Sequence, residues 1–313
     1  MSELLSAAQG WDALRHHRGA AVGARDIIMA DGPDTVSFLQ GQLSQDVAVM
    51  VSGDLRWSLH LQPQGKVIAV LRLTRLSHDA VLIDTDPGAG ADVFGALSRF
   101  KIRTKCDLTL KEMVPSIFVR GPEASAATLP LDTVFPAPSE LVAGASITLA
   151  AAPWAGPGYD IIATSGSVPP ERASDIGTVD SDVFEAYRIF SGVPRHGFEI
   201  ADGPIPVETG LVPFTVAFGK GCYVGQELVE RLDSRNRQIR RLVGIDLPPG
   251  PVPEPGASVV DENGKEVGSL TSAALRPDTG SVVALAMVRS TVEAGSILSV
   301  DGVTAISRAL GWQ

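Results

Sequence analysis

The sequence predicts an α+β fold, in which helices and strands mix over most of the chain and the last region contains strands alone. Three observations lead to this expectation. The first half alternates short apolar runs typical of strands with helical periodicity. Residues 247–256, LPPGPVPEPG, carry five prolines and break regular structure. Around and beyond that break, short β-rich runs alternate with turn residues, which indicates a small barrel or sandwich over residues 240–313.

The elements of the first half follow from periodicity. A helix is expected over residues 34–47, because Val36, Leu39 and Leu43 recur at helical spacing after an aspartate that can cap. A second helix is expected over residues 92–100, and a short alanine-rich one after residue 122. The strands expected between turn residues are 26–30, 55–61, 66–73, 80–84, 116–120 and 159–163.

The clearest later helix follows Asp182, which forms a capping-box pattern with Glu185. Its apolar residues fall at i, i+3, i+4 and i+7 from residue 183 to residue 190, and Gly192 is expected to end it. Another helix is expected over residues 226–232. The strands expected in the last region are 242–247, 258–260, 266–272, 281–288 and 297–300, with hairpin turns at Asn263-Gly264 and Asp301-Gly302.

Charge and composition argue against several partners. The chain has 313 residues with 36 acidic and 26 basic side chains, a net charge of -10. Direct DNA binding and binding to an anionic membrane both need a basic face, so neither is expected. No apolar run reaches the roughly 18 residues that a membrane span needs. The first residues lack a basic segment followed by an apolar core, so we expect a cytoplasmic protein.

Two cysteines, Cys106 and Cys222, are too few for a disulfide framework in a chain of this length. They are also too few to hold an iron–sulfur cluster or a structural zinc ion, which usually take four ligands. No metal site formed by this chain alone is therefore expected. A transient contact between Cys222 and a cluster held mainly by a partner stays open.

The segment 219–227, GKGCYVGQE, is the most informative in the chain. Its glycines allow positive φ, and the loop is expected to lead into a helix N-terminus, where free N–H groups favour an anion. With Lys220 nearby, Cys222 could be a thiolate that attacks an electrophile. The alternative is a tight turn in which Cys222 is a small buried residue and Lys220 is solvated.

The run KGCYVGQE, residues 220–227, matches the motif K-G-C-Y-x-G-Q-E of the YgfZ-type folate-binding proteins. These are relatives of the glycine-cleavage T-protein. Other segments fit in the same order, so the resemblance covers nearly the whole chain, although only the eight-residue motif is specific. The supporting segments are GPDTVSFLQGQLSQDV, LQPQGKVIAVLRL, IFVRGPEA, FEAYRIFSGVPRHG, RRLVGIDL and GKEVGSLTSA.

The resemblance implies a T-protein-like fold. Residues 1–239 would form two interleaved α+β subdomains around a central hole that holds tetrahydrofolate, and residues 240–313 a β-barrel. It also implies an accessory role in iron–sulfur cluster assembly or repair, with iron–sulfur proteins such as tRNA-modifying enzymes, or assembly factors, as partners. The alternatives are a tetrahydrofolate-dependent aminomethyltransferase or demethylase, and a non-catalytic interaction module on the same fold.

The family pattern also suggests which residues carry chemistry. Cys222 and Lys220 are candidates for a thiol step. An aspartate after the third strand assists aminomethyl transfer in T-proteins, and its match here is Asp92, or else Asp84 or Asp86. A solvated helix cap explains Asp92 equally well.

Cofactor-binding candidates come from the motif and its surroundings. Tyr223, Gln226 and Glu227 belong to the motif itself. A pterin ring needs a carboxylate that accepts two N–H groups, but Phe190 stands where T-proteins have an acidic residue. Glu199 or Glu208 could substitute, or both could be surface carboxylates.

The anionic glutamyl tail of a folate needs arginine or lysine. The run of residues 230–241 is a local basic island, from which Arg231 and Arg237 are the candidates. The island could instead hold an RNA phosphate or an acidic partner, or be a solvated helix end.

Overall fold

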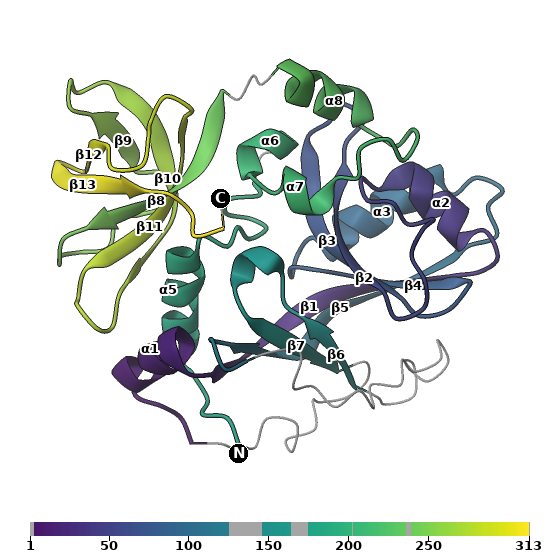
Figure 1. Ribbon diagram of the computed structural model, residues 1–313, viewed down its shortest axis with the longest axis horizontal. Coiled ribbons are helices and arrows are strands. Elements are labelled where there is room, and N and C mark those ends of the chain that lie inside the picture. Colours follow the sequence, from purple (N-terminus) through teal and green to yellow (C-terminus); the bar gives the residue numbers. More distant parts are fainter. Residues whose placement is uncertain (1–2, 125–145, 164–174, 202, 236–238, 313) are drawn as a thin grey trace.

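The computed structural model describes residues 3–124, 146–163, 175–201, 203–235 and 239–312. Figure 1 shows a small barrel at one end of the molecule and a long sheet at the other. Helix α5 (Ser181–Ser191) lies between the two, and helix α1 (Ala7–His16) packs against it below the barrel. The expected α+β class with a C-terminal barrel is confirmed, while the expected alanine-rich helix falls largely outside the described residues.

In the described residues, a seven-stranded antiparallel sheet has the order β2-β3-β4-β1-β5-β7-β6. Because β4 and β5 flank β1, segments far apart in sequence meet at the centre of the sheet. Its strands are β1 (Gly19–Asp31), β2 (Leu55–Leu61), β3 (Val67–Arg75), β4 (Ala80–Thr85), β5 (Asp107–Arg120), β6 (Ser146–Ala150) and β7 (Gly158–Ala163).

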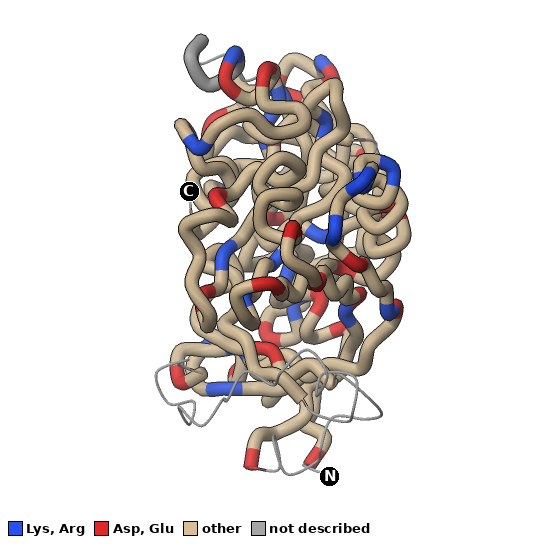
Figure 2. Tube along the Cα trace, turned by 90° about the vertical axis from the view of Figure 1, so that its right-hand side faces the viewer, with Lys and Arg blue, Asp and Glu red and all other residues tan. Residues whose placement is uncertain are grey.

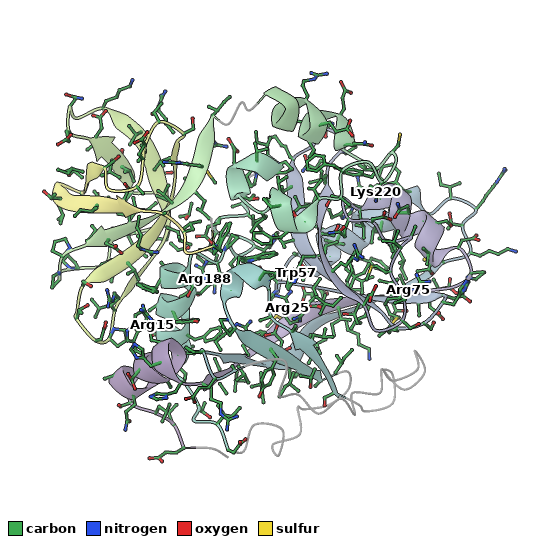
Figure 3. The ribbon with its side chains drawn as sticks, in the orientation of Figure 1. Arg15, Arg25, Trp57, Arg75, Arg188 and Lys220 are labelled. Atoms are coloured by element: carbon green, nitrogen blue, oxygen red, sulfur yellow. The ribbon has the colours of Figure 1, made fainter. Side chains whose placement is uncertain are left out.

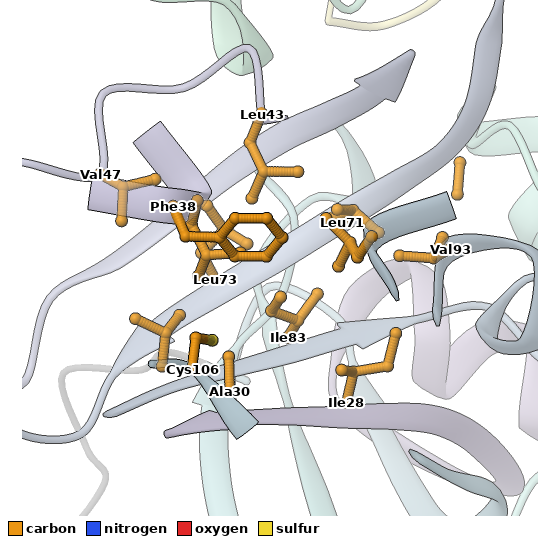
Figure 4. Packing of buried hydrophobic residues seen from close by; sticks show 14 of the residues in the cluster. Ile28, Ala30, Phe38, Leu43, Val47, Leu71, Leu73, Ile83, Val93 and Cys106 are labelled. Atoms are coloured by element: carbon orange, nitrogen blue, oxygen red, sulfur yellow. The ribbon is translucent and has the colours of Figure 1, made fainter. Parts of the chain in front are cut away.

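Helices α2 (Thr35–Gln42) and α3 (Gly90–Phe100) bury one face of this sheet. Figure 4 shows Phe38 and Val93 packed over Leu71 and Ile83, with Cys106 among the same apolar side chains. Cys106 is thus a core residue, and desolvation raises the pKa of its thiol. Burial of this cluster supplies the main driving force for the sheet and its helices to associate.

Helix α2 ends at Gln42, five residues before the end expected from periodicity. Leu43 is already extended, with φ -111° and ψ 153°. The apolar residues that prolonged the helical pattern remain buried, because Leu43 and Val47 reach the core from the following turn. Periodicity identified the buried face correctly and overestimated the length of the helix.

The caps of α5 follow local chemistry. Asp180, two residues before the expected capping residue, accepts the N–H of Asp182 at 2.9 Å. Gly192 ends the helix in the left-handed conformation, as expected. Helix α1 was not expected from the sequence, although Ser6 and Gln9 form a capping box at its start.

Three helices, α6, α7 and α8, lie between α5 and the first barrel strand, and the segment GKGCYVGQE leads into α8, while the short 3-10 helix η2 joins β6 to β7. Helix α8 begins at Gln226, as expected, so the glycine-rich loop does lead into a helix N-terminus. The four elements are η2 (Pro153–Ala155), α6 (Pro206–Thr209), α7 (Val212–Thr215) and α8 (Gln226–Arg235).

The C-terminal region closes into a barrel of order β10-β11-β8-β13-β12-β9. The hairpin expected at Asp301-Gly302 is present with both residues at positive φ, and it leads into β13, a strand that periodicity missed. The first barrel strand starts at Arg240, while a domain boundary at residues 239 and 240 stays a prediction. The strands are β8 (Arg240–Leu247), β9 (Ser258–Asp261), β10 (Glu266–Leu275), β11 (Val282–Arg289), β12 (Ile297–Val300) and β13 (Val303–Arg308).

Two strands of the large sheet are much longer than expected. Strand β1 covers 13 residues and β5 covers 14, whereas the sequence predicted five residues of each. Arg25 and Asp26 interrupt the apolar pattern of β1 but are buried and paired inside the protein. Strand length was underestimated because these charged side chains point inward.

Candidate functional site

A central cavity of about 630 Å³ lies between the sheet, α5 and residues 193–198. Figure 3 shows Arg25 and Trp57 beside it at the middle of the molecule, with Arg188 on the side of the barrel. Its volume is within the range of small-molecule binding sites. The aromatic side chains in its wall are Trp57, Phe118, Trp154, Phe184, Tyr187 and Phe198.

The aromatic side chains hold one another in place. Phe118 and Phe184 are stacked, with centroids 5.9 Å apart and an interplanar angle of 16°. Trp57 and Trp154 meet edge to face at 4.9 Å. Rings fixed in this way offer flat apolar surfaces at little entropic cost, which suits a planar heteroaromatic ligand.

A buried network of opposite charges forms another part of the wall. Arg72 donates to both carboxylate oxygens of Asp84, at 2.8 and 2.9 Å, and to Asp160 at 2.7 Å. Arg25 reaches Asp84 at 2.9 Å, and Arg120 reaches Asp160 at 2.7 Å. Burial by itself would raise the pKa of Asp160, but the guanidinium groups of Arg120 and Arg72 lower it. The network therefore keeps charged groups fixed beside the cavity.

The three aspartates that the sequence offered as catalytic candidates lie in different places. Asp84 is fully buried in the charge network. Asp86 lines the central cavity, where it pairs with Arg25 and accepts the backbone N–H of His196 at 3.0 Å. Asp92 is exposed on α3 and lines a second cavity of about 740 Å³. His196 lines both cavities.

Helix α5 supplies the charged groups on the opposite side of the central cavity. Arg188 donates to both oxygens of Glu185, at 2.9 and 2.8 Å, and Arg195 reaches Glu185 at 3.0 Å. Burial disfavours the charged form of Arg188, but Glu199 and Glu185 together raise its pKa. A carboxylate has room for further donors, so Glu185 can still accept a ligand N–H.

The two glutamates expected to bind a pterin have structural partners. Glu199 is buried and accepts hydrogen bonds from Arg188 at 2.9 Å and from the hydroxyls of Thr271 and Ser272. Glu208 is buried and pairs with Arg240 at 3.0 Å. Neither is among the described residues that line the two cavities. Both tie the α+β region to the barrel.

Lys220 anchors the glycine-rich loop. Its ammonium group donates to the backbone carbonyls of Gln40, Leu43 and Gln45, at 2.7, 2.6 and 2.8 Å. These carbonyls belong to the end of α2 and the turn after it, which the helix itself leaves without partners. Burial lowers the pKa of Lys220 to about 8.

The other motif residues also shape the loop. The N–H of Tyr223 donates to the side chain of Gln226 at 3.2 Å, and burial raises the pKa of the Tyr223 hydroxyl to about 12. Gly225 has φ of 82°, and a Cβ there would lie 2.7 Å from the carbonyl oxygen of Gln62. The glycine is therefore required by close packing of two backbones.

Cys222 is exposed, as the reactive-thiol interpretation expects. It is not among the described residues that line the central cavity or the second cavity. The thiol and the central cavity are therefore separate features of the protein, and any thiol chemistry would take place on the surface.

Three members of the basic island whose side chains the structure describes already have partners. Arg231 pairs with Glu227 one helical turn away, Arg240 pairs with Glu208, and Arg241 donates to the carbonyl of Val292. Arg237 lies outside the described residues. The cations beside the central cavity, Arg25, Arg188 and Arg195, were not singled out from the sequence, although charged residues within an apolar strand are a usable signal.

Phe190, which stands where T-proteins have an acidic residue, points away from the central cavity. It packs against Trp11 with centroids 5.6 Å apart, and the guanidinium of Arg15 lies 4.1 Å from its ring centroid. Phe190 is not among the described residues in the wall. Phe190 therefore belongs to the contact between α1 and α5 and not to the described cavity wall.

Comparisons with known proteins agree with this geometry. Residues 240–304 match the glycine cleavage T-protein C-terminal barrel domain. The tRNA-modifying protein YgfZ of Klebsiella pneumoniae is 24% identical over 277 residues, which cover 86% of this chain and 84% of that protein. An aminomethyltransferase of Saccharopolyspora erythraea is 24% identical over 292 residues, which cover 88% and 79% of the two chains.

A solved structure settles the fold. The crystal structure of glycine cleavage system aminomethyltransferase T from Bartonella henselae matches with a TM-score of 0.80 at 20% identity, covering 99% of this chain and 90% of that chain. The chain is a relative of YgfZ-type proteins and has the T-protein fold. The resemblance indicated by KGCYVGQE is thereby confirmed.

Two further findings concern membrane spans and metal-binding groups in the described residues. Over residues 3–124, 146–163, 175–201, 203–235 and 239–312, no helix has the length and apolar character needed to span a membrane. Within the same ranges, no three His, Cys, Asp or Glu side chains come together as a metal-binding group.

Proposed function

We propose that this protein is a YgfZ-type, folate-binding accessory factor whose central cavity takes tetrahydrofolate. The observation that carries the proposal is the cavity itself, about 630 Å³ of space with aromatic faces and fixed charges of both signs, in a chain with the T-protein fold. Apolar walls with a few converging polar groups are typical of cofactor sites.

The residues of the wall suit a reduced pterin. Its ring can lie against Phe184 or Trp57, while its two adjacent N–H donors need a carboxylate. Asp86 and Glu185 are only 26% and 27% exposed, and arginines hold both in place. Asp182 also lines the cavity, at the start of α5. Any of these three is better placed than Glu199 or Glu208.

The glutamyl tail of the ligand requires a cation near the cavity. Arg195 lines the wall, its side chain is 36% exposed, and its guanidinium lies 4.1 Å from the ring centroid of Phe198. It pairs with Glu185 through one nitrogen, so other donors remain for a carboxylate. We assign Arg195 to the tail in preference to the island that contains Arg231 and Arg237.

Calorimetric titration with 5-formyltetrahydrofolate, a stable reduced folate, tests the binding site. We expect saturable binding by the unmodified protein and about tenfold weaker binding by Phe184→Ala, which removes a stacking surface. Phe218→Ala is the matched control, because Phe218 is 51% exposed and outside the described cavity wall. Absence of binding at millimolar ligand would overturn the folate proposal.

For Cys222 we propose a surface thiol step with a partner that holds most of an iron–sulfur cluster. Exposure of the thiol and the firm anchor at Lys220 support this role. In the part of the chain that the structure describes, no three His, Cys, Asp or Glu side chains form a metal-binding group, which fits a transient contact with a cluster held elsewhere. Tetrahydrofolate binding and the thiol step would then use separate parts of the protein.

The thiol role is tested in cells that lack the endogenous protein. Cys222→Ala should lower the amount of a modified tRNA nucleoside made by a cluster-dependent enzyme, whereas Cys106→Ala should leave it unchanged at equal protein levels. Calorimetry on purified Cys222→Ala should show normal folate affinity. If both variants restore the nucleoside fully, Cys222 has no chemical role and the motif serves only to fold the loop.

A further inference from the structure

Residues 99–105, RFKIRTK, form a basic run at the end of α3. Four of the seven residues are basic, in a chain whose net charge is -10. Arg99, Arg103 and Lys105 are exposed. Among the described residues, the only ion pair of this run joins Lys101 to Asp107 at 3.6 Å. Figure 2 looks onto the side of the molecule that carries α2 and α3, where basic and acidic residues are both present.

Two apolar side chains stand between these cations. Phe100 is 46% exposed and Ile102 is 77% exposed, which is unusual for residues of this size. An alternation of basic and exposed apolar side chains offers charge and a stacking surface on one segment. Proteins that bind single-stranded nucleic acid combine these two features.

The backbone of the basic run is held firmly. The N–H of Lys105 donates to the carboxylate of Asp34 at 2.8 Å, and its carbonyl accepts the N–H of Asp34 at 3.1 Å. The next residue, Cys106, is buried in the core. Arg103 has φ of 58°, a left-handed conformation that turns the chain. The side chains are thus presented from a fixed frame, which lowers the entropy lost on binding.

The second cavity opens beside this run. Arg99 and Phe100 belong to both, and the other lining residues include His60, Gln62 and Gln64. His60 is only 1% exposed, and its Nδ1 has no hydrogen-bond partner among the described residues. A buried polar atom in this situation calls for a ligand or an ordered water.

The polar groups of this cavity suit a nucleobase better than a phosphate. Burial lowers the pKa of His60 to about 4, so the ring is neutral at pH 7 and offers one donor and one acceptor. The side-chain amides of Gln62 and Gln64 likewise offer both. The edges of nucleobases carry the same mixture of donors and acceptors.

We propose that residues 99–105 and the second cavity bind an RNA strand, with phosphates on the basic side chains and an unpaired base in the cavity against Phe100. The cations supply affinity without sequence preference, and the cavity selects an unstacked base. This site needs neither tetrahydrofolate nor Cys222, so it stands independently of the function proposed above.

The electrostatic part is tested by fluorescence anisotropy with an unstructured, labelled 12-nucleotide RNA at several salt concentrations. For Arg103→Gln/Lys105→Gln we expect at least fivefold weaker binding. The slope of log K against log salt should also become less steep by about 1.4, since each single-strand phosphate contact contributes about 0.7. The control pair, Lys265→Gln/Arg289→Gln, removes the same charge from exposed barrel positions and should change affinity less than twofold.

The base-binding part is tested with Phe100→Ala. We expect about tenfold weaker binding to the RNA and unchanged binding to an abasic oligonucleotide of equal length, because only the stacking contact is lost. An equal loss for both oligonucleotides would overturn the base pocket.

Three other results would overturn the proposal as a whole. They are no binding by the unmodified protein at millimolar RNA, equal weakening by the control pair, and competition by polyglutamate of the same charge as effective as that by RNA. The last result would identify an acidic protein segment as the ligand. Calorimetry with 5-formyltetrahydrofolate is expected to be unchanged in all of these variants, which separates this test from that of the folate site.

Discussion

The central cavity is built from residues far apart in the sequence, whereas the glycine-rich loop at Cys222 is one continuous segment. The cavity wall draws on β1, β5, β7 and α5, and its three strands meet only because the sheet has the order β1-β5-β7. The loop is a single stretch of nine residues, and its main anchor is the end of α2. A motif can therefore mark the loop in the sequence, whereas the cavity becomes visible only when the strands are paired.

The comparison predicts that substitutions in the cavity wall lower the free energy of unfolding more than substitutions in the loop. Arg72→Met is the variant with the largest expected effect. The variant removes the one arginine that bonds to both Asp84 and Asp160 and leaves these buried carboxylates with fewer partners. We expect a loss of about 3–5 kcal/mol in the free energy of unfolding, measured by urea denaturation. Arg289→Met, at an exposed position, should stay within about 0.5 kcal/mol. A loss below about 1 kcal/mol at Arg72 would contradict the importance of the network.

Acid should destabilise the wall of the second cavity through His60. Its folded pKa of about 4 lies below the usual histidine pKa of 6.5, so between these values the unfolded chain binds a proton that the folded protein excludes. Stability is therefore lost as pH falls from about 6.5 to 4, by about 3 kcal/mol from this group. In His60→Gln this part of the pH dependence should be absent. Unfolding free energies at pH 7, 5 and 4 for both proteins provide the measurement.

In the loop, Lys220→Met should have a moderate effect. The change leaves three carbonyls at the end of α2 without a charged donor, which should cost about 2 kcal/mol in the free energy of unfolding. Folate affinity should persist, because Lys220 is outside the described cavity wall. Thermal unfolding and calorimetry on the same sample separate these effects. A stability equal to that of the unmodified protein would show that water replaces the ammonium group.

The smallest effect is expected for Cys222→Ala. The side chain is exposed and packs against no core, so the free energy of unfolding should change by less than about 0.5 kcal/mol. A melting temperature within about 1 °C of the unmodified protein, by differential scanning calorimetry, is the expected outcome. A larger shift would mean that the cysteine is structural, and the contrast between loop and cavity would weaken.

Much of the fold was accessible from sequence. Apolar periodicity located most strands of the large sheet, α3, α5 and most of the barrel, because their buried faces follow regular spacing. Helix α1 and strands β6 and β13 were missed. In α1 the buried residues Trp11 and Leu14 are few among polar neighbours, and in β13 four of six residues are exposed or half-buried.

Less of the candidate site could be found in this way. The motif pointed to Cys222 and Lys220. In the structure Cys222 is exposed on the surface, and Lys220 anchors the loop to the end of α2. The cations of the central cavity lie within strands or helices whose pairing the sequence does not specify. Arg25 and Asp86 are 61 residues apart and form an ion pair because β1 and β4 are neighbours.

The imidazole of His196 belongs to the walls of both cavities, and its Nδ1 has no partner among the described residues. Because one ring borders both spaces, a molecule that shifted it from one side would change the space on the other side. Such an effect must be mutual. If one ligand changes the affinity of the second by a given factor, the second changes the affinity of the first by the same factor.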